Sequence, residues 1–286
     1  MPTFQNRATL SLGDTVISSN VVQGEITEVL RITKTAVNGQ YVPGDTVTYV
    51  VSVVNTGAAP YTGLTLIDNL GEYTFGGGSL VPLTYAEGTV LVYADGVLQP
   101  QPAVAEPFVI TGLTVPAGGN LLVIYSAEVN RFAPPAVGSS VTNSVTLTGG
   151  GLSSPLTAEE TITAEASPSL TITKAISPSV ITENGTITYT FVIQNTGNTP
   201  VVATDGAVIT DIFETTAAGL TVTFNGESWT EGEEYTYNNA TGLFTATGPI
   251  TVPAATYTQD PGTGEWMLQP GVSELVIVAT GVQIRA

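Results

Sequence analysis

The chain contains two lysines, Lys34 and Lys174, which occupy the same place in two related segments, LRITK and LTITK. Side chains alternate between the two faces of a β-strand, so Lys34 shares its face with Leu30 and Ile32. Lys174 stands in the same relation to the apolar residues of its own segment. Both amines are therefore expected to point into an apolar core.

Acid and amide side chains follow the same pattern. Asp68 in LTLID and Asp211 in VITDI fall on the apolar faces of their segments, as do Asn143 in VTNSV and Asn6 in FQNRA. Burying a charge costs several kcal/mol unless the charge is paired or neutralised. The pattern therefore predicts that lysine, aspartate and asparagine side chains meet inside the protein.

Two outcomes relieve this cost. Lysine and aspartate can form a buried ion pair with asparagine beside it, or lysine can condense with asparagine to an amide and release ammonia. The second reaction needs a neutral amine, which desolvation favours, and a protonated carboxyl group that polarises the asparagine carbonyl. Under this hypothesis the catalytic acids are Asp68 and Asp211, and the cross-links join Lys34 to Asn143 and Lys174 to Asn6. The residues leave both outcomes open.

The composition excludes several classes of function. The 286 residues include no histidine and no cysteine, and 24 acidic residues against 6 basic ones give a net charge of −18. Catalysis by Ser-His or Cys-His pairs is excluded, and we expect no metal site and no cofactor. The acidic charge disfavours nucleic acid as a partner, and no apolar run of 18 residues predicts insertion into a membrane.

The order of segments predicts an all-β protein. The chain is rich in Val, Thr and Gly, and short alternating segments recur with turn signals between them. ENGTITYTFVIQNTG repeats PGDTVTYVVSVVNTG, which indicates two tandem immunoglobulin-like β-sandwich domains. We place an N-terminal hairpin in residues 1–28, domain 1 in 29–166 and domain 2 in 167–286. An additional hairpin is expected in domain 2 around residues 235–244.

The N-terminal hairpin, residues 4–26, is similar to the closing hairpin of domain 1, residues 141–165. FQNRATLS aligns with VTNSVTLT, which places Phe4, Asn6, Ala8 and Leu10 on one face of a strand. Domain 2 is expected to lack such a hairpin, because only four residues follow Val282. The hairpin is therefore predicted to complete domain 2 of another copy, in a head-to-tail homopolymer. The alternatives are a hairpin that folds back onto its own domain 2 and a flap on domain 1.

The segments RITKTAV, PGDTVTYVVSVVNTG, LTLIDNL and VTNSVTLT together resemble the conserved-repeat surface domain of bacterial envelope proteins. That resemblance covers both repeats and implies an immunoglobulin-like sandwich in an extracellular protein. The set Lys34, Asn143 and Asp68 is also similar to the sites of self-crosslinking pilin and adhesin domains. The start, MPTFQNR, carries no recognisable secretion signal, and in this the chain resembles strand-donating fibre subunits associated with spores.

The sequence thus favours a structural, non-enzymatic subunit of an extracellular filament, on a cell or spore surface. Its chemistry would be limited to autocatalytic formation of its own cross-links. The alternative is an adhesin-like binding module for a glycan or a host surface ligand. That alternative depends on the acidic residues 227–234 and on aromatic residues that could line a carbohydrate site: Trp229, Tyr235, Tyr237 and Trp266.

Overall fold

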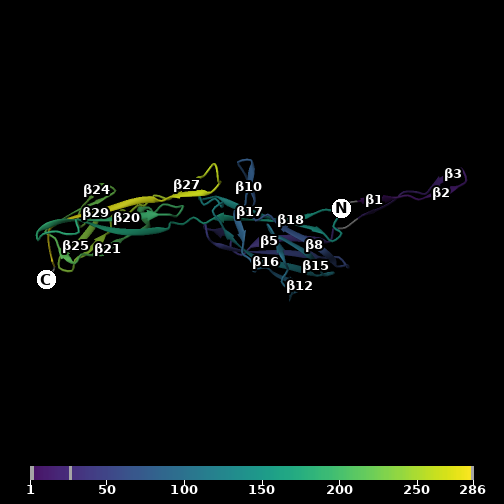
Figure 1. Cartoon of the computed structure of the whole chain (residues 1–286), viewed down its shortest axis with the longest axis horizontal. Helices are drawn as coiled ribbons and strands as arrows, with labels where there is room; N and C mark the ends of the chain where they lie inside the picture. The colour runs from purple at the N-terminus through teal and green to yellow at the C-terminus, as the bar shows by residue number, and fades with distance from the viewer. Residues whose placement is uncertain (1–2, 26–27, 285–286) are drawn as a thin grey trace.

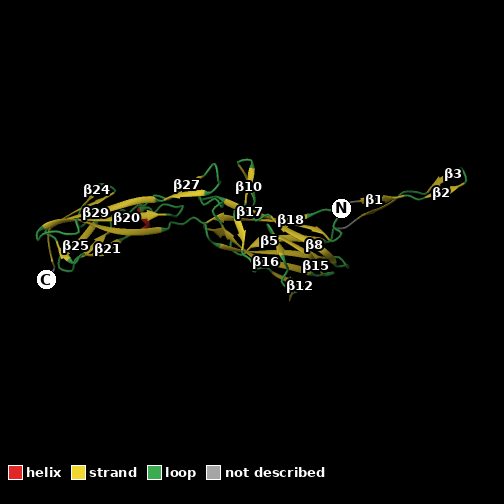
Figure 2. Cartoon of the chain, in the orientation of Figure 1, coloured by secondary structure: helices red, strands yellow, loops and turns green. Residues whose placement is uncertain are grey.

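The chain is almost entirely β-strand and forms an elongated row of three parts (Figures 1 and 2). The computed structural model describes residues 3–25 and 28–284. An N-terminal hairpin lies at one end, domain 1 in the middle and domain 2 at the other end. In the described ranges the one helical element is a 3-10 turn, η1 (Ala203–Asp205), and no helix there could cross a membrane. The predicted all-β sandwich class is confirmed.

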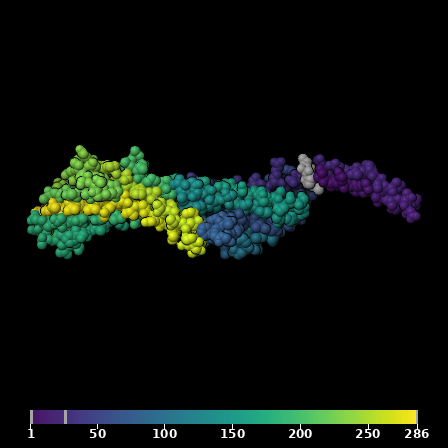
Figure 3. Space-filling model, turned by 90° about the horizontal axis from the view of Figure 1, so that it is seen from above, coloured from purple at the N-terminus to yellow at the C-terminus, as the bar shows by residue number. Residues whose placement is uncertain are grey.

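The N-terminal hairpin consists of four short strands, β1 (Thr3–Asn6), β2 (Thr9–Leu12), β3 (Thr15–Ser18) and β4 (Val22–Glu25). β1 pairs with β4 and β2 with β3, both antiparallel. The tight turn falls at Gly13, whose φ of 57° suits glycine. Figure 3 shows this segment standing clear of the body of the molecule. Of the residues 1–28 predicted for the hairpin segment, residues 1–2 and 26–27 lie outside the described residues.

Domain 1 is a sandwich of two sheets. Its strands are β5 (Leu30–Ala36), β6 (Gln40–Tyr41), β7 (Thr46–Asn55), β8 (Tyr61–Asp68), β9 (Tyr73–Phe75), β10 (Gly78–Leu80), β11 (Leu83–Tyr85), β12 (Leu91–Ala94), β13 (Val97–Leu98), β14 (Val104–Ala105), β15 (Val109–Val115), β16 (Asn120–Val129), β17 (Ser140–Gly149) and β18 (Leu156–Ala164). One sheet runs β13-β12-β16-β7-β5, with β11 also on β16, and the other runs β14-β15-β8-β17-β18-β6.

The alternation of β7 explains why its sequence forms a core strand. Its burial alternates along the whole strand, and the inward residues are Val47, Tyr49, Val51 and Val53. β16 alternates in the same way and pairs with β7 along its length, so the two strands present one continuous apolar surface. The second sheet packs on this surface and closes the core of domain 1.

Domain 2 has a six-stranded principal sheet and a smaller sheet. Its strands are β19 (Leu170–Ser177), β20 (Gly185–Asn195), β21 (Ile209–Ile212), β22 (Thr215–Thr216), β23 (Gly219–Phe224), β24 (Glu227–Trp229), β25 (Tyr235–Asn238), β26 (Leu243–Ala246), β27 (Thr256–Gln259), β28 (Trp266–Gln269) and β29 (Gly271–Ile284). The principal sheet runs β19-β20-β29-β23-β24, with β22 also on β29, and the smaller one runs β21-β26-β25.

The repeated segments occupy equivalent places in the two domains. β19, β20 and β29 correspond to β5, β7 and β16, whereas β21, β26 and β25 correspond to β8, β15 and β14. The hairpin expected as an addition at residues 235–244 is therefore not one, because β25 and β26 are regular members of the smaller sheet. The additional element is β27–β28, which separates VPAA from GVSELV, whereas domain 1 joins the matching segments directly.

The β27–β28 hairpin also joins the two domains. The backbone N–H of Trp266 donates to the carbonyl of Arg131 at 3.1 Å, and Gln259 Nε2 donates to the Tyr73 hydroxyl at 2.9 Å. Arg131 and Glu265 form an ion pair at 3.2 Å. These contacts link domain 1 to domain 2 at their junction.

The two domains differ at one sheet edge. β8 of domain 1 pairs with β15 on one side and with β17 on the other. β21, its counterpart, pairs with β26 on one side and has no strand on the other within residues 3–25 and 28–284. An edge of this kind exposes unpaired backbone N–H and C=O groups and can accept another strand.

Candidate functional site

Four strands of domain 1 bring their polar side chains to one point in the core. Lys34 lies on β5, Asp68 ends β8, and Asn143 lies on β17. Asp68 is opposite Val145 in the β8–β17 ladder, and Asn143 lies two residues from Val145 on the same face. Tyr125 enters from β16. The alternation read from the sequence therefore agrees with the structure for the first three of these residues.

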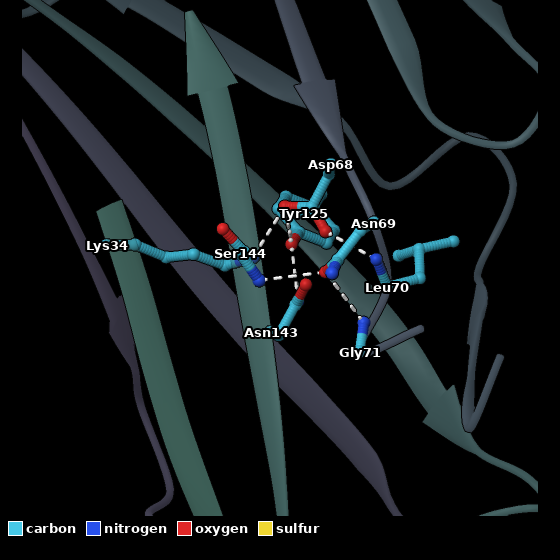
Figure 4. Close-up of polar contacts among 8 residues, drawn as sticks. All are labelled: Lys34, Asp68, Asn69, Leu70, Gly71, Tyr125, Asn143 and Ser144. Carbon is cyan, nitrogen blue, oxygen red and sulfur yellow. Dashed lines mark hydrogen bonds and ion pairs between the residues drawn. The ribbon is translucent and has the colours of Figure 1, made fainter. Parts of the chain in front are cut away.

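The four side chains form one continuous set of contacts (Figure 4). Lys34 Nζ lies 2.6 Å from Asp68 Oδ2, and the Tyr125 hydroxyl donates to the same oxygen at 2.6 Å. Asn143 Nδ2 donates to the Tyr125 hydroxyl at 3.0 Å. The other Asp68 oxygen, Oδ1, accepts from the backbone N–H of Leu70 at 2.9 Å. The contacts thus run from lysine through aspartate and tyrosine to asparagine.

Burial sets the electrostatics of this site. The side chains of Lys34 and Asp68 are both 0% exposed. Desolvation lowers the pKa of Lys34 from 10.5 to about 8, although Asp68 and, more weakly, Glu160 favour its charged form. Burial therefore makes the neutral amine of Lys34 easier to reach than that of a free side chain. Desolvation thus favours the form of Lys34 that amide formation would require.

In the structure, Asp68 contacts Lys34 and Tyr125 rather than the carbonyl of Asn143. Asp68 was expected to polarise the carbonyl of Asn143, but both oxygens of Asp68 bond to other groups. Asn143 Oδ1 is buried and has no hydrogen-bond partner among the described residues. The carboxylate instead contacts the nucleophile and Tyr125.

Sequence reasoning missed two members of this site. Tyr125 lies in the alternating segment NLLVIYSAEV, where its buried place was readable but its contact with Asp68 was not. Its ring stacks on Tyr49 at 5.5 Å and packs on Phe108 at 4.3 Å, and burial raises its pKa well above the usual value. Glu160 lies opposite Asn143 in the β17–β18 ladder.

The equivalent site of domain 2 is open. Lys174 and Asp211 form an ion pair, but their side chains are 40% and 18% exposed. Lys174 Nζ lies over the rings of Tyr189 at 4.9 Å and Phe213 at 5.4 Å. Ile277 takes the place of Tyr125, since Ile277 pairs with Tyr189 as Tyr125 pairs with Tyr49. This site thus has the lysine and the acid, without the tyrosine.

Asn6 lies at the end of β1, opposite Val22, in the N-terminal hairpin. All the residues predicted for the donor strand, Phe4, Asn6, Ala8 and Leu10, are exposed. The structure of a single chain therefore does not bring Asn6 to Lys174. The register also differs from the alignment: Phe4 is opposite Gly24, whereas the alignment with β17–β18 would place it opposite Ile26.

The aromatic residues considered for glycan binding mostly serve the core of domain 2. Trp229 stacks on Phe224 at 5.1 Å, and Tyr235 is 4% exposed. Tyr237 packs 5.8 Å from Phe213. Trp266 belongs to the β27–β28 hairpin at the junction with domain 1. These residues do not form one exposed aromatic platform.

The sequence matches no protein-family model and no curated protein sequence. Membership of the conserved-repeat surface-domain family, expected from the motifs, is therefore not supported. Among solved structures, the chain is similar to pilin subunits and adhesin domains at low identity.

Several of these structures are pilins. The major pilin BcpA of Bacillus cereus is 12% identical, with a TM-score of 0.35 over 94% of this chain and 73% of that chain. The major pilin GBS80 fragment of Streptococcus agalactiae is 13% identical, with a TM-score of 0.34 over 85% and 91%. The pilus backbone RrgB of Streptococcus pneumoniae is 16% identical, with a TM-score of 0.33 over 84% and 55%.

Enzymes also occur among the similar structures. A family 123 glycoside hydrolase from Clostridium perfringens is 11% identical, with a TM-score of 0.32 over 48% of this chain and 27% of that chain. The chain thus spans about half the length of RrgB and about a quarter of that enzyme. With TM-scores below 0.5, neither the pilins nor the enzyme assign a function to this chain.

Proposed function

We propose that the chain is the structural subunit of an extracellular filament, on a cell or spore surface. In this proposal the N-terminal hairpin of one subunit completes domain 2 of the next. The main observation behind this proposal is that β21 has an unpaired edge, whereas the equivalent edge of β8 in domain 1 pairs with β17.

The exposed face of domain 2 supports the proposal. Every residue of β19 is exposed, whereas the inward residues of β5 are covered by the second sheet of domain 1. On the face of β19 that carries Lys174, Leu170, Ile172 and Ile176 are 46%, 52% and 48% exposed. Burying a fully exposed side chain of this size contributes ~1.5–3 kcal/mol, so covering one of these half-exposed side chains contributes roughly half of that. Domain 2 therefore offers both an unpaired strand and an apolar surface to a partner.

The N-terminal hairpin has the matching properties. Phe4 and Leu10 are 53% and 63% exposed, and β1–β4 bury no side chain of their own. The hydrogen bonds recorded for residues 3–25 all run inside the hairpin. Aligning the hairpin with β17 puts Ala8 opposite Asp211, as Val145 is opposite Asp68. Asn6 then takes the place of Asn143, next to the Lys174–Asp211 pair.

The positions of donor and acceptor favour exchange between copies. The N-terminal hairpin and domain 2 lie at opposite ends of the molecule, with the whole of domain 1 between them (Figure 1). A contact from one end of a subunit to the other end of its neighbour is head-to-tail, and repeated contacts of this kind build filaments. Folding back within one chain would require the hairpin to pass along domain 1.

The finer part of the proposal is covalent. Lys34 and Asn143 form an amide inside domain 1, with Asp68 as the assisting acid, and ammonia leaves. After strand exchange, Lys174 forms the same bond with Asn6 of the neighbouring subunit, with Asp211 as the acid. The meeting of Lys34, Asp68 and Asn143 in a dry core supports the first bond, and the sequence alignment supports the second.

Electron microscopy tests the assembly. The full chain, examined by negative stain, should form regular fibres, and a chain without residues 1–27 should not. A full chain that stays a two-lobed monomer at high concentration, or a truncated chain that forms the same fibres, contradicts the proposal.

A further inference from the structure

The hydrogen bonds of domain 1 connect the nucleophile to the leaving group of the proposed reaction. Asp68 Oδ2 contacts Lys34 Nζ at 2.6 Å and the Tyr125 hydroxyl at 2.6 Å. The same hydroxyl accepts from Asn143 Nδ2 at 3.0 Å. Nδ2 is the atom that would leave as ammonia. Figure 4 shows the hydroxyl between the carboxylate and the amide.

We propose that Tyr125 is a catalytic residue, whose hydroxyl relays a proton from Asp68 to the leaving nitrogen of Asn143. The inference rests on the proposed covalent step in domain 1. It adds a residue that the lysine, aspartate and asparagine pattern does not contain.

The reaction balances without another reactant. Asp68 first takes a proton from the Lys34 ammonium, and the neutral amine attacks Cγ of Asn143, forming the new C–N bond. The carbonyl electrons move to Oδ1. Once Asp68 is protonated, the Tyr125 hydroxyl, which had donated to Oδ2, accepts from it and turns its own hydrogen toward Nδ2. Asp68 then gives its proton to the Tyr125 oxygen while the tyrosine's own proton passes to Nδ2. A hydroxyl can do both because it donates one hydrogen and accepts through its lone pairs.

The last steps return the electrons and break the old bond. Asp68, again a carboxylate, takes the second proton from the lysine nitrogen. The electrons on Oδ1 re-form the carbonyl, the bond from Cγ to Nδ2 breaks, and ammonia leaves. The reaction starts from the Lys34 ammonium, the Asp68 carboxylate and the Asn143 primary amide. It ends with a secondary amide between Lys34 and Asn143, a neutral Asp68 carboxylic acid and free ammonia. The buried ion pair is thereby replaced by neutral groups, which a dry core favours.

Burial explains why a protein group must carry this proton. The side chains of Lys34 and Asp68 are 0% exposed, and Tyr125 and Asn143 are also 0% exposed. Bulk water therefore does not reach Nδ2 in the folded domain. Asp68 Oδ1 is held by the N–H of Leu70, so the route from Asp68 to Nδ2 passes through Oδ2 and the tyrosine. If Tyr125 only filled space in the core, its hydroxyl would not be needed, because a phenylalanine ring fills the same volume.

The same inference distinguishes the two domains. Ile277 takes the place of Tyr125 in domain 2, so the Lys174–Asn6 bond lacks this relay. We therefore expect the internal bond of domain 1 to form faster than the bond between subunits. The internal amide of domain 1 would therefore form before the amide that joins neighbouring subunits of the filament.

The test follows ammonia loss by intact mass in the full chain. All chains carry Asn6→Ala, which removes the bond between subunits and leaves only the internal one. They are recovered unfolded, refolded together and sampled over time into denaturant. Tyr125→Phe should slow ammonia loss by about a hundredfold, within the usual contribution of a positioned acid or base. Tyr41→Phe is the matched control: Tyr41 is equally buried but its hydroxyl donates to the Pro134 carbonyl.

The outcomes separate the relay from the covalent step. If the parent chain loses no ammonia, the covalent step itself is wrong. If the parent and Tyr125→Phe lose ammonia at the same rate, the covalent step stands and the relay is overturned. Circular dichroism confirms that each variant has refolded. Where Tyr125→Phe does not refold, 3-fluorotyrosine at position 125 keeps the shape and makes the phenol more acidic. Its rate should then differ from that of the parent, and an unchanged rate overturns the relay.

Discussion

Leu30 and Leu170 occupy the same place in the two domains, but Leu30 is 5% exposed and Leu170 is 46% exposed. The sequence around them is nearly the same, so local structure does not explain the difference. Domain 1 has β17 and β18 over this face, and the described residues of domain 2 have no counterpart. The difference in exposed fraction between Leu30 and Leu170 indicates how much apolar surface of domain 2 a donor hairpin would cover.

A peptide with the sequence of the N-terminal hairpin should stabilise domain 2 of a chain from which that hairpin has been deleted. A chain without residues 1–27 should bind a synthetic peptide of residues 4–26, because the peptide supplies the missing strands of domain 2. At 100 times its Kd the peptide stabilises the folded state by about 2.7 kcal/mol, which calorimetry detects as a higher Tm. A peptide with the same composition in scrambled order is the control. Equal effects of the two peptides would contradict recognition of the hairpin.

The bond between subunits should be visible after boiling. Wild-type fibres boiled in detergent should give a ladder of covalent multimers, because amides survive conditions that reverse strand exchange. Asn6→Ala should keep native fibres and lose the ladder, and Lys174→Ala should do the same. Asn143→Ala, which affects only the internal bond, should keep the ladder. A branched tryptic peptide joining the segments of Asn6 and Lys174 identifies the bond, and wild-type fibres that boil wholly to monomer exclude it.

Removing the acid of domain 1 should affect both chemistry and stability. Asp68→Ala should prevent the internal loss of ammonia, since no group then takes the proton of Lys34. It also leaves the Lys34 amine buried without its partner, which costs about 3–5 kcal/mol in the free energy of unfolding. Intact mass and urea unfolding measure the two effects. The control is Asn143→Ala, which cannot form the Lys34–Asn143 amide but keeps the Lys34–Asp68 ion pair. A full ammonia loss in Asp68→Ala would remove the acid from the mechanism.

The uncross-linked protein should become more stable as the pH rises above 8. The pKa of Lys34 is lowered from 10.5 to about 8 in the folded state. Between these values the unfolded chain binds more protons than the folded one, so the free energy of unfolding rises with pH. The whole window corresponds to about 3 kcal/mol.

This pH effect is best measured on the Asn143→Ala chain between pH 8 and 9.5. Above that range the buried tyrosines act in the opposite direction, because burial raises the pKa values of Tyr41, Tyr49 and Tyr125. The unfolded chain then loses tyrosine protons that the folded chain keeps. Lys34→Met is the control and should show a flat dependence in the lower range. A falling stability of the Asn143→Ala chain from pH 8 to 9.5 would contradict the lowered lysine pKa.

The sequence by itself determined the β class and the inward direction of Lys34, Asp68 and Asn143. Alternation is a local property of a strand, so the face of each residue can be read from its neighbours. The repeat also identified Lys174 and Asp211 as the matching pair of domain 2. The same local pattern does not show that Lys174 and Asp211 lie on a face of domain 2 that remains partly exposed.

Tertiary structure decided which atoms meet. Strand alternation does not determine the register between β8 and β17 or the place of β16, so it could not put the Tyr125 hydroxyl between Asp68 and Asn143. It also could not show that Asn143 Oδ1 is left without a partner among the described residues. Contacts between residues far apart in the chain depend on how the sheets pack, and that is set by the whole domain rather than by any one segment.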